Sequence, residues 1–390
     1  MRSIGVVTTS RADYGIYLPV LRRISHEPGL NIRLFVTGMH LSPDFGRTVE
    51  DIEKDGFMIQ EKVEMLLASD TPEDIAKSMG LGTIGFAKAF SRWKPDILLV
   101  LGDRFEMHAA AVAALPFMIP IAHIHGGERT EGAIDEALRH SITKMSHLHF
   151  VATDDFAHRV IQMGEEPWRV IISGAPSLDN LKEFVPLTLA ELEVRVGMAL
   201  PERGFLLVTF HPVTLEYEQA SEQTNNLLAA LAAIEMPVVF TLPNADTAGK
   251  EVRKLICEFV AKISSARAVE NMGTRGYFSL MARAAAMVGN SSSGLLEAPS
   301  FQLPVVNVGT RQLGRVRAAN VLDCGYEKKD IMDALYISLS LKFRTSLAGL
   351  VNPYGDGNAA DRIVTLLKEV DLDKNLLIKH FYDLPQDSRV

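Results

Sequence analysis

Short runs rich in Val, Ile and Leu alternate along this chain with longer segments in which apolar residues recur at helical spacing. This alternation is typical of parallel β-sheets whose strands are connected by covering helices. It occurs in both halves of the 390 residues, and a chain of this length usually forms two domains. We therefore expect an α/β protein with two doubly wound, Rossmann-like parallel-sheet domains that face a central cleft.

In the first half, apolar runs predict six strands. They are Ile4–Thr9, Ile32–Thr37, Phe57–Lys62, Ile97–Leu101, Ile119–His125 and His149–Thr153. Helical spacing predicts Tyr14–His26, Pro43–Lys54, Pro72–Trp93, Glu106–Ala114, Asp135–Met145 and Asp155–Met163. Thr71 before Pro72 is a typical helix start, because threonine caps well and proline suits the first helical position.

The second half repeats the pattern, after one last short strand that ends near residues 173–176. The expected strands are Phe205–Phe210, Val238–Leu242, Ala266–Glu270, Ala286–Gly289 and Val305–Val308. The expected helices are Glu216–Ile234, Thr247–Ile263, Gly276–Ala285 and Ile331–Leu341. Turn-rich residues 352–358 then precede a final helix over Ala359–Val370.

Composition excludes several classes of protein. A net charge of −8 argues against nucleic acid as a partner, so an anionic ligand must be held by local arginines and backbone donors. The two cysteines, Cys257 and Cys324, exclude a disulfide framework and a C-x-x-C metal or redox site. No stretch has the length of a signal-peptide core or of a membrane span, so we expect a cytoplasmic protein without a membrane partner.

Two nucleotide motifs give no support for a cofactor. Residues 80–85 match G-x-G-x-x-G, but they lie in a helical pattern rather than after a strand, so the context is wrong for NAD. The phosphate-binding pattern G-x-x-x-x-G-K-[ST] does not occur. We expect no cofactor.

Arg11 follows the first expected strand and precedes a helix, where an arginine suits a phosphate. Capping of that helix by Ser10 or Asp13 explains the segment equally well.

Asp103 and Arg104 end a buried apolar strand abruptly. Asp103 together with Glu106 also fits a capping-box-like helix start. The adjacent Arg104 favours a functional role, because two opposite charges then lie at one strand tip.

His123 and His125 continue an apolar strand, where residues two apart share a face. A metal site is one interpretation, with His147 and His149 as a second pair, but no H-E-x-x-H or similar ligand set accompanies them. We therefore expect no metal. The glycines that follow His125 suggest backbone close to a ligand.

Asp135 and Glu136 begin a helix, where acidic residues usually complement the helix dipole. Near a histidine pair they could instead serve as acid and base.

In the second half, His211 and Asn244 place polar side chains at two strand tips. Residues 289–298, Gly-Asn-Ser-Ser-Ser-Gly-Leu-Leu-Glu-Ala, are the most specific local signal, because three hydroxyls follow a strand and open a helix. Such a segment can bind an anion, whereas N-capping explains only one serine. Glu297 could accept hydrogen bonds from a ribose, and Arg311 after the next strand suits a phosphate.

These segments resemble the hydrolysing UDP-N-acetylglucosamine 2-epimerase family of bacterial sialic and legionaminic acid biosynthesis, over essentially the whole chain. The similar motifs are residues 10–15, 37–40, 101–104, 123–128, 135–143, 211–214, 289–297, 309–312 and 352–354, together with a bacterial-type tail at 381–385. The resemblance implies a GT-B-like fold in which residues 1–173 and a returning C-terminal helix, 359–390, form the first domain. Residues 174–358 would form the UDP-binding domain.

The resemblance also implies roles for individual residues. UDP or substrate binding falls to Arg11, His40, Arg104, Glu128, His211, Asn244, Ser291, Ser292, Glu297 and Arg311. Catalysis falls to Asp103, His125, Asp135, Glu136 and His211. Relatives that do not hydrolyse the substrate, and the animal enzyme, carry glutamate where this chain has His125, so His125 is a candidate of its subgroup.

The implied reaction converts UDP-N-acetylglucosamine and water into N-acetylmannosamine and UDP. Anti elimination of UDP would give a 2-acetamidoglucal, and syn addition of water would follow. UDP-2,4-diacetamido-2,4,6-trideoxyglucose is an alternative substrate, and a GT-B glycosyltransferase or a nucleotide-sugar sensor is an alternative function. The family resemblance further implies a homodimer or homotetramer.

Overall fold

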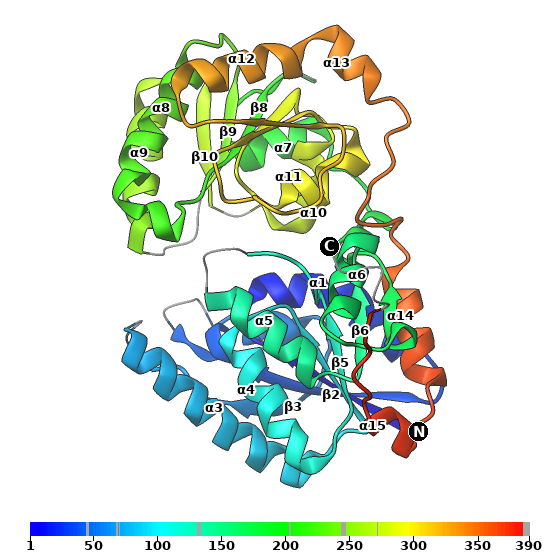
Figure 1. The fold of residues 1–390 in the computed structure, drawn as a ribbon. Coiled ribbons are helices and arrows are strands. Elements are labelled where there is room, and N and C mark those ends of the chain that lie inside the picture. Colours follow the sequence, from blue (N-terminus) through cyan, green and yellow to red (C-terminus); the bar gives the residue numbers. More distant parts are fainter. Residues whose placement is uncertain are drawn as a thin grey trace. The chain divides into compact units, whose positions relative to one another are not determined.

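The computed structural model describes residues 1–384, apart from residues 44–46, 68, 70, 131–133, 203, 243–246 and 271. The chain divides into two compact units (Figure 1). The first is formed by residues 1–129, 133–182 and 354 onward, and the second by residues 183–353 together with residues 130–132. Among the described helices, none combines the length and apolar character needed to cross a membrane.

The first unit contains a seven-stranded parallel sheet with the order β3-β2-β1-β4-β5-β6-β7. Its strands are β1 (Arg2–Thr8), β2 (Leu30–Thr37), β3 (Ile59–Val63), β4 (Ile97–Leu101), β5 (Ile121–Ile124), β6 (Leu148–Val151) and β7 (Val170–Ile172). Val6 of β1 lies opposite Leu34 on one side and Leu99 on the other. The strand order reverses between β1 and β4, and α/β sheets bind ligands outside the carboxyl ends of strands at such a switch point.

Helices connect these strands and bury their apolar sides against the sheet. They are α1 (Arg11–Ser25), α2 (Val49–Lys54), α3 (Pro72–Trp93), α4 (Phe105–Ala114), α5 (Ile134–Met145), α6 (Asp154–Gln162), α14 (Ala359–Glu369) and α15 (Lys374–Leu377), with 3-10 turns η1 (Gly38–Leu41), η3 (Leu115–Phe117), η4 (Pro167–Arg169) and η5 (Pro176–Leu181). Helix α4 lies between α3 and α5, and α1 packs against α14 (Figure 1). Ile363, Val364 and Leu367 of α14 are fully buried in the core of this unit.

The first unit extends further along the chain than expected, to residue 182 rather than 173, because η5 packs on α1 and α14. Asp179 in η5 accepts backbone N–H bonds from Ala359 and Ala360 at 3.0 and 2.7 Å, and so caps the start of α14. Tyr354 also belongs to this unit, since its carbonyl accepts a bond from Ala175 N at 2.7 Å and its ring lies against Phe156.

The second unit contains a six-stranded parallel sheet with the order β10-β9-β8-β11-β12-β13. Its strands are β8 (Leu206–Thr209), β9 (Val238–Thr241), β10 (Ala266–Val269), β11 (Ala286–Gly289), β12 (Val305–Val308) and β13 (Val321–Cys324). The order again reverses, here between β8 and β11. Two doubly wound parallel sheets were expected, and this prediction is confirmed. The edge strand β13 was not predicted, because it is four residues long, only partly buried and carries an aspartate.

The second unit contains two helices, at residues 189–196 and 341–346, that were not predicted, and its other helices differ from expectation in several places. The helices of this unit are α7 (Leu189–Val196), η6 (Thr214–Gln219), α8 (Ala220–Ala232), α9 (Thr247–Lys262), α10 (Gly273–Met281), α11 (Ser293–Leu296), η7 (Ala298–Phe301), α12 (Lys328–Leu339) and α13 (Leu341–Ser346). The helix expected from Glu216 is interrupted there, because Glu216 has non-helical φ and ψ angles of −118° and 19°. The helix expected after the three serines is a single turn.

Candidate active site

Arg11 is the first residue of α1, directly after β1, and its side chain is exposed. Ser10 and Asp13 form a capping box at this helix start. The Asp13 carboxylate also accepts hydrogen bonds from the Thr8 and Thr9 hydroxyls at 3.0 and 2.8 Å. The capping interpretation is therefore confirmed for Ser10 and Asp13, whereas the assignment of Arg11 to a phosphate stays a prediction.

The alternative interpretation of Asp103 and Glu106 as a capping box is wrong. Helix α4 begins after Arg104, and no side chain caps it. The buried Glu106 carboxylate binds the Arg104 guanidinium instead, with Oε1–Nη2 and Oε2–Nε distances of 2.9 and 3.2 Å. Burial would lower the pKa of Arg104, but the carboxylates of Glu106, Asp13 and Asp135 together raise it. A fixed guanidinium therefore lies at the switch point.

Gly38, after β2, leaves the space that the Glu106 carboxylate occupies. Its φ of +62° favours glycine, and a Cβ at this position would lie 2.9 Å from Glu106 Oε1.

Asp103 lies beside a buried arginine that sequence reasoning missed. Arg139 of α5 is 3% exposed, and its guanidinium pairs with the Asp103 carboxylate and, at 3.4 Å, with Glu136. The available signal was the position of Arg139 among buried residues of the same helix, Leu138 and Ile142. A buried charge must be paired, so Arg139 holds two of the expected catalytic carboxylates together.

Asp135 is the second residue of α5 and is partly buried. Burial raises the pKa of its carboxyl group, and the opposing effect of the Arg104 guanidinium is smaller. A carboxyl group with a raised pKa is suited to hold and deliver a proton.

His125 occupies the turn after β5 in the left-handed backbone region, with φ at +65°. A non-glycine residue seldom adopts this conformation. His125 Nδ1 lies 2.5 Å from Glu128 Oε1, and both side chains are buried. His125 Nε2 is also buried and has no hydrogen-bond partner among the residues that the structure describes. Glu128 was expected at the substrate, but the structure places it against His125.

The turn that carries His125 is held by the surrounding backbone. The His125 amide donates to the Phe150 carbonyl at 3.0 Å, and Arg159 donates to the Gly127 carbonyl. Gly127 has φ at +76°, and a Cβ there would overlap the Phe156 carbonyl. The position of His125 is therefore set by the fold.

His40, which was expected to bind substrate, is fully buried below the end of β1. Its Nε2 lies 3.0 Å from Thr8 Oγ1 and its Nδ1 lies 2.7 Å from Thr48 Oγ1. Burial lowers the pKa of His40, against the effect of Asp13. Because both ring nitrogens bind within the protein, this arrangement supports the strand end and offers no nitrogen to a ligand.

His123 is also used internally. Its Nε2 lies 2.8 Å from the Gly102 carbonyl and its Nδ1 3.2 Å from Thr143 Oγ1, and burial lowers its pKa to about 3. Strand β5 ends at Ile124, so the alternation rule that would place His123 and His125 on one face does not reach His125.

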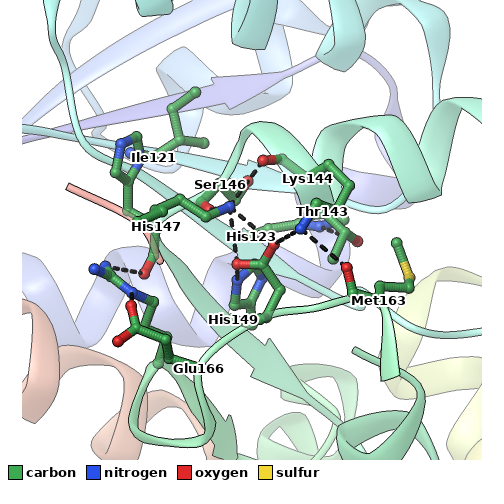
Figure 2. Close-up of polar contacts among 12 residues, drawn as sticks. Ile121, His123, Thr143, Lys144, Ser146, His147, His149, Met163 and Glu166 are labelled. Carbon is green, nitrogen blue, oxygen red and sulfur yellow. Dashed lines mark hydrogen bonds and ion pairs between the residues drawn. The ribbon is translucent and has the colours of Figure 1, made fainter. Parts of the chain in front are cut away.

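The second histidine pair lies beside a buried carboxylate, Glu165, in the region where Figure 2 shows His147, His149 and Lys144. His149 Nε2 lies 2.9 Å from Glu165, and Lys144 and Lys379 bind the same carboxylate at 2.6 and 2.8 Å. His147 accepts a bond from a strand amide at Nδ1, and burial lowers its pKa to about 4. These histidines therefore serve packing of the sheet and of the C-terminal segment.

A cavity of about 600 Å³ adjoins this site within the first unit, at the ends of β2, β3 and β4. Its apolar wall includes Met39, Leu41, Met65 and Phe105, and Arg104 contributes charge.

In the second unit, Asn290 joins the polar residues that follow β8, β11 and β12. Its side chain accepts from His211 N at 2.7 Å and donates to the His211 carbonyl at 2.8 Å. Its carbonyl accepts bonds from Arg311 at 3.0 Å and Gln312 at 2.8 Å. Burial, together with Arg311, lowers the pKa of His211 to about 4. The structure thus brings the expected His211 and Arg311 together through Asn290.

The helix that follows the three serines is shorter than expected, since α11 has only four residues. Ser291 Oγ accepts from Ser293 N at 3.3 Å, Ser292 precedes α11, and Glu297 ends that single turn. The dipole of one turn is weak, so hydroxyls and backbone donors must provide most of any anion binding here. Asn244 lies outside the described residues.

Comparison with known proteins places this fold and these motifs in context. The family model described as UDP-N-acetylglucosamine 2-epimerase matches residues 22–368. The GDP/UDP-N,N'-diacetylbacillosamine 2-epimerase (hydrolyzing) of Campylobacter jejuni is 39% identical over 386 residues, which cover 98% of this chain and 99% of that protein. The UDP-N,N'-diacetylbacillosamine 2-epimerase (hydrolyzing) of Legionella pneumophila is 37% identical and covers 97% and 99%.

Among solved structures, UDP-GlcNAc 2-epimerase from Neisseria meningitidis bound to UDP-GlcNAc superposes with a TM-score of 0.82 at 21% identity. The match covers 95% of this chain and all of that one, so the GT-B-like fold is shared.

Proposed function

Because this chain belongs to the UDP-N-acetylglucosamine 2-epimerase family, we propose that it converts a UDP-linked 2-acetamido sugar and water into UDP and the free manno-configured sugar. The observation that carries this proposal is the group of acid and base side chains at the switch point of the first unit. Asp103, His125 and Asp135 all follow the carboxyl ends of β4 and β5, where α/β sheets bind ligands.

The stereochemistry requires at least two proton-transfer groups. Carbon 2 is inverted, so the proton must leave from one face of the sugar and return to the other. His125 with its unpartnered Nε2 suits removal of the proton, because a base needs a free lone pair. Asp135 suits return of a proton, because burial raises the pKa of its carboxyl group.

Asp103 and Arg104 supply charge near the same point. The Arg104 guanidinium is fixed by Glu106 and could stabilise the departing diphosphate. Asp103 is fixed by Arg139, so its carboxylate is preorganised for the elimination step.

The nucleotide is assigned to the second unit. Arg311 and His211 are linked by Asn290 at the switch point of the second sheet. Ser291, Ser292 and Glu297 follow the same strand, and hydroxyls with a carboxylate suit a diphosphate and a ribose diol. Arg11 and Asn244 are also assigned to UDP binding, as the family resemblance implies.

For the sugar, we favour N,N'-diacetylbacillosamine, which is 2,4-diacetamido-2,4,6-trideoxyglucose. Both relatives described above are named for this sugar, at 39% and 37% identity. The apolar wall of the cavity beside Arg104 also suits a methyl group at carbon 6 better than a hydroxymethyl group. UDP-N-acetylglucosamine is the second candidate, since the matching family model carries that description.

The reaction can be tested in D2O by proton NMR with UDP-N,N'-diacetylbacillosamine, its GDP counterpart and UDP-N-acetylglucosamine. We expect free UDP and a manno-configured free sugar with deuterium at carbon 2, fastest with UDP-N,N'-diacetylbacillosamine. The matched control is Asp103→Asn, which should still bind UDP but lose most turnover.

Other products would contradict the proposal in distinct ways. An intact epimeric nucleotide sugar would mean a non-hydrolysing enzyme, and no reaction with any of the three would overturn the proposed function. Unchanged turnover by Asp103→Asn would remove Asp103 from the catalytic group. We also propose a cytoplasmic location, and a homodimer or homotetramer as the family resemblance implies. Sedimentation would measure the assembly.

A further inference from the structure

The turn after β5 keeps two features that are unfavourable for folding. His125 is held at a positive φ, which glycine or asparagine would adopt with less strain. Its Nε2 is buried without a hydrogen-bond partner among the described residues, and buried polar atoms are almost always bonded. Strain and an unsatisfied polar atom on the same residue point to a functional constraint.

The contact with Glu128 fixes where the histidine carries its proton. An ionised carboxylate can only accept hydrogen bonds, so the ring nitrogen that faces it must donate. Glu128 Oε1 faces Nδ1 at 2.5 Å. In the neutral ring, the lone pair is then on Nε2, the nitrogen that has no partner.

The geometry leaves Glu128 little freedom to act elsewhere. It is 6% exposed, and the turn between the two residues is held by Arg159 on the Gly127 carbonyl. A side chain buried in this way acts through the group that it contacts more readily than on a ligand.

We propose that Glu128 is a positioning residue, which holds His125 in the Nδ1–H form so that Nε2 removes the proton from carbon 2. This inference rests on the proposed function. In that step the C2–H bond breaks and the proton passes to Nε2. The electron pair of the C2–H bond forms the second bond between C1 and C2. The C1–O bond breaks, and its electron pair leaves with UDP. The imidazolium then releases its proton to water before the next cycle.

The chain offers an internal control of the same chemistry. His149 and Glu165 form a second buried histidine–glutamate pair, at 2.9 Å, with two lysines on the same carboxylate (Figure 2). This pair joins the sheet to the C-terminal segment rather than lying at a switch point. Glu165→Gln should therefore affect stability while leaving kcat and KM unchanged.

The experiment compares full-length wild type, Glu128→Leu, Glu128→Gln, His125→Gln and the His125→Gln/Glu128→Leu double variant, with Glu165→Gln as control. Initial rates of UDP release give kcat and KM, calorimetry with UDP checks that each variant is folded, and ¹⁵N-histidine NMR reports which nitrogen of His125 is protonated. We expect Glu128→Leu to lower kcat by about 100-fold, with KM changed by less than about threefold. The kcat of Glu128→Gln, which keeps an acceptor oxygen, should lie between those of Glu128→Leu and wild type.

The double variant decides whether Glu128 acts through His125. We expect it to be no slower than His125→Gln alone, because residues that act as a unit are not additive. Additive losses, or a rise in KM with kcat unchanged, would place Glu128 directly on the substrate and overturn the positioning role. An Nε2–H form of His125 in the wild type would also overturn it. Failure of the wild type to turn over any of the three substrates would overturn the proposed function itself, a separate result that the NMR measurement distinguishes.

Discussion

At the scale of single residues, Arg139 shows how a buried charge organises the candidate site. Its guanidinium pairs with Asp103 and Glu136, whose side chains are each 24% exposed, while Arg139 itself is 3% exposed. Two residues of α5 and the end of β4 are thereby linked. Removal of such a partner leaves carboxylates without their counter-charge.

Arg139→Ala should therefore reduce both stability and turnover. We expect a loss of about 2–4 kcal/mol in the free energy of unfolding, and about 100-fold in turnover because Asp103 is displaced. Both tryptophans, Trp93 and Trp168, belong to the first unit, so urea unfolding followed by their fluorescence reports on this unit.

The control for Arg139 is Arg92→Ala. Arg92 forms an ion pair with Glu61 at 2.9 Å but is 58% exposed, so its removal should change stability by less than about 1 kcal/mol. Similar losses for the two variants would contradict the structural role of Arg139.

At the scale of elements, the helices and strands that were predicted well are those whose ends are determined by residues nearby in the sequence. Helix α3 was predicted with its observed ends, because Thr71 caps it and Pro72 begins it within a few residues of sequence. Strands β11 and β12 were predicted for a similar reason, as short apolar runs bounded by turn residues. The left-handed turn at His125 could not be predicted, since the apolar run continues into it and its conformation depends on contacts with Phe150 and Arg159.

The same distinction holds within the site. The site residues that follow strand ends could be predicted from the sequence, because the carboxyl ends of parallel strands lie at one edge of a sheet. Their partners were not, since the pairing of Asp103 with Arg139 joins residues 36 apart and depends on how α5 packs. The Asp103–Glu106 capping box failed because Glu106 satisfies Arg104 instead.

The C-terminal segment depends on a charge cluster that is sensitive to acid. Burial alone would raise the pKa of Glu165, but bonds from His149, Lys144 and Lys379 lower it to about 2, from a usual value near 4.5. Burial lowers the pKa values of His149 and Lys379, and the Glu165 carboxylate opposes both shifts. A carboxylate whose pKa is lowered by folding stabilises the folded state above its unfolded pKa, and this stabilisation is lost as the pH falls through the folded value.

Glu165→Gln should thus be less stable than wild type by about 3 kcal/mol at pH 7, from about 1.4 kcal/mol per pKa unit. The difference should narrow as the pH falls below about 4.5 and approach zero near 2. Unfolding curves between pH 7 and pH 3 measure it. The control is Glu73→Gln on α3, where Glu73 is 76% exposed beside Lys77 and should matter little at any pH. A deficit that stays constant with pH would contradict the ion-pair explanation.

At the scale of the whole molecule, the two units differ in which parts of the chain form their cores. The core of the second unit is drawn from one continuous stretch, between Leu206 and Leu339. The core of the first unit combines residues 4–150 with Ala360, Ile363, Val364, Leu367 and Leu376 from the end of the chain. Of the two core clusters, only that of the second unit therefore comes from a single segment of the chain.

A fragment of residues 183–353 should fold alone and bind UDP. We expect cooperative unfolding and an affinity for UDP within about tenfold of the whole chain, a difference of about 1.4 kcal/mol. Arg311→Gln in this fragment should weaken UDP binding by about tenfold or more. The control is Arg253→Gln, which removes an exposed ion pair with Glu270 and should leave UDP binding unchanged. A folded fragment without affinity for UDP would mean that the first unit supplies essential nucleotide contacts.

The return of the chain to its first unit also sets an order of events during synthesis. Residues 1–182 leave the ribosome first, yet their core lacks the apolar side of α14 and the segment that Arg169 binds through the carbonyls of Asn375, Leu376 and Ile378. At about 5–20 residues per second, the roughly 200 residues that follow take about 10–40 s to appear. The second unit can complete its core in that interval, so the N-terminal unit would be the last to finish folding and the one in need of protection on the ribosome.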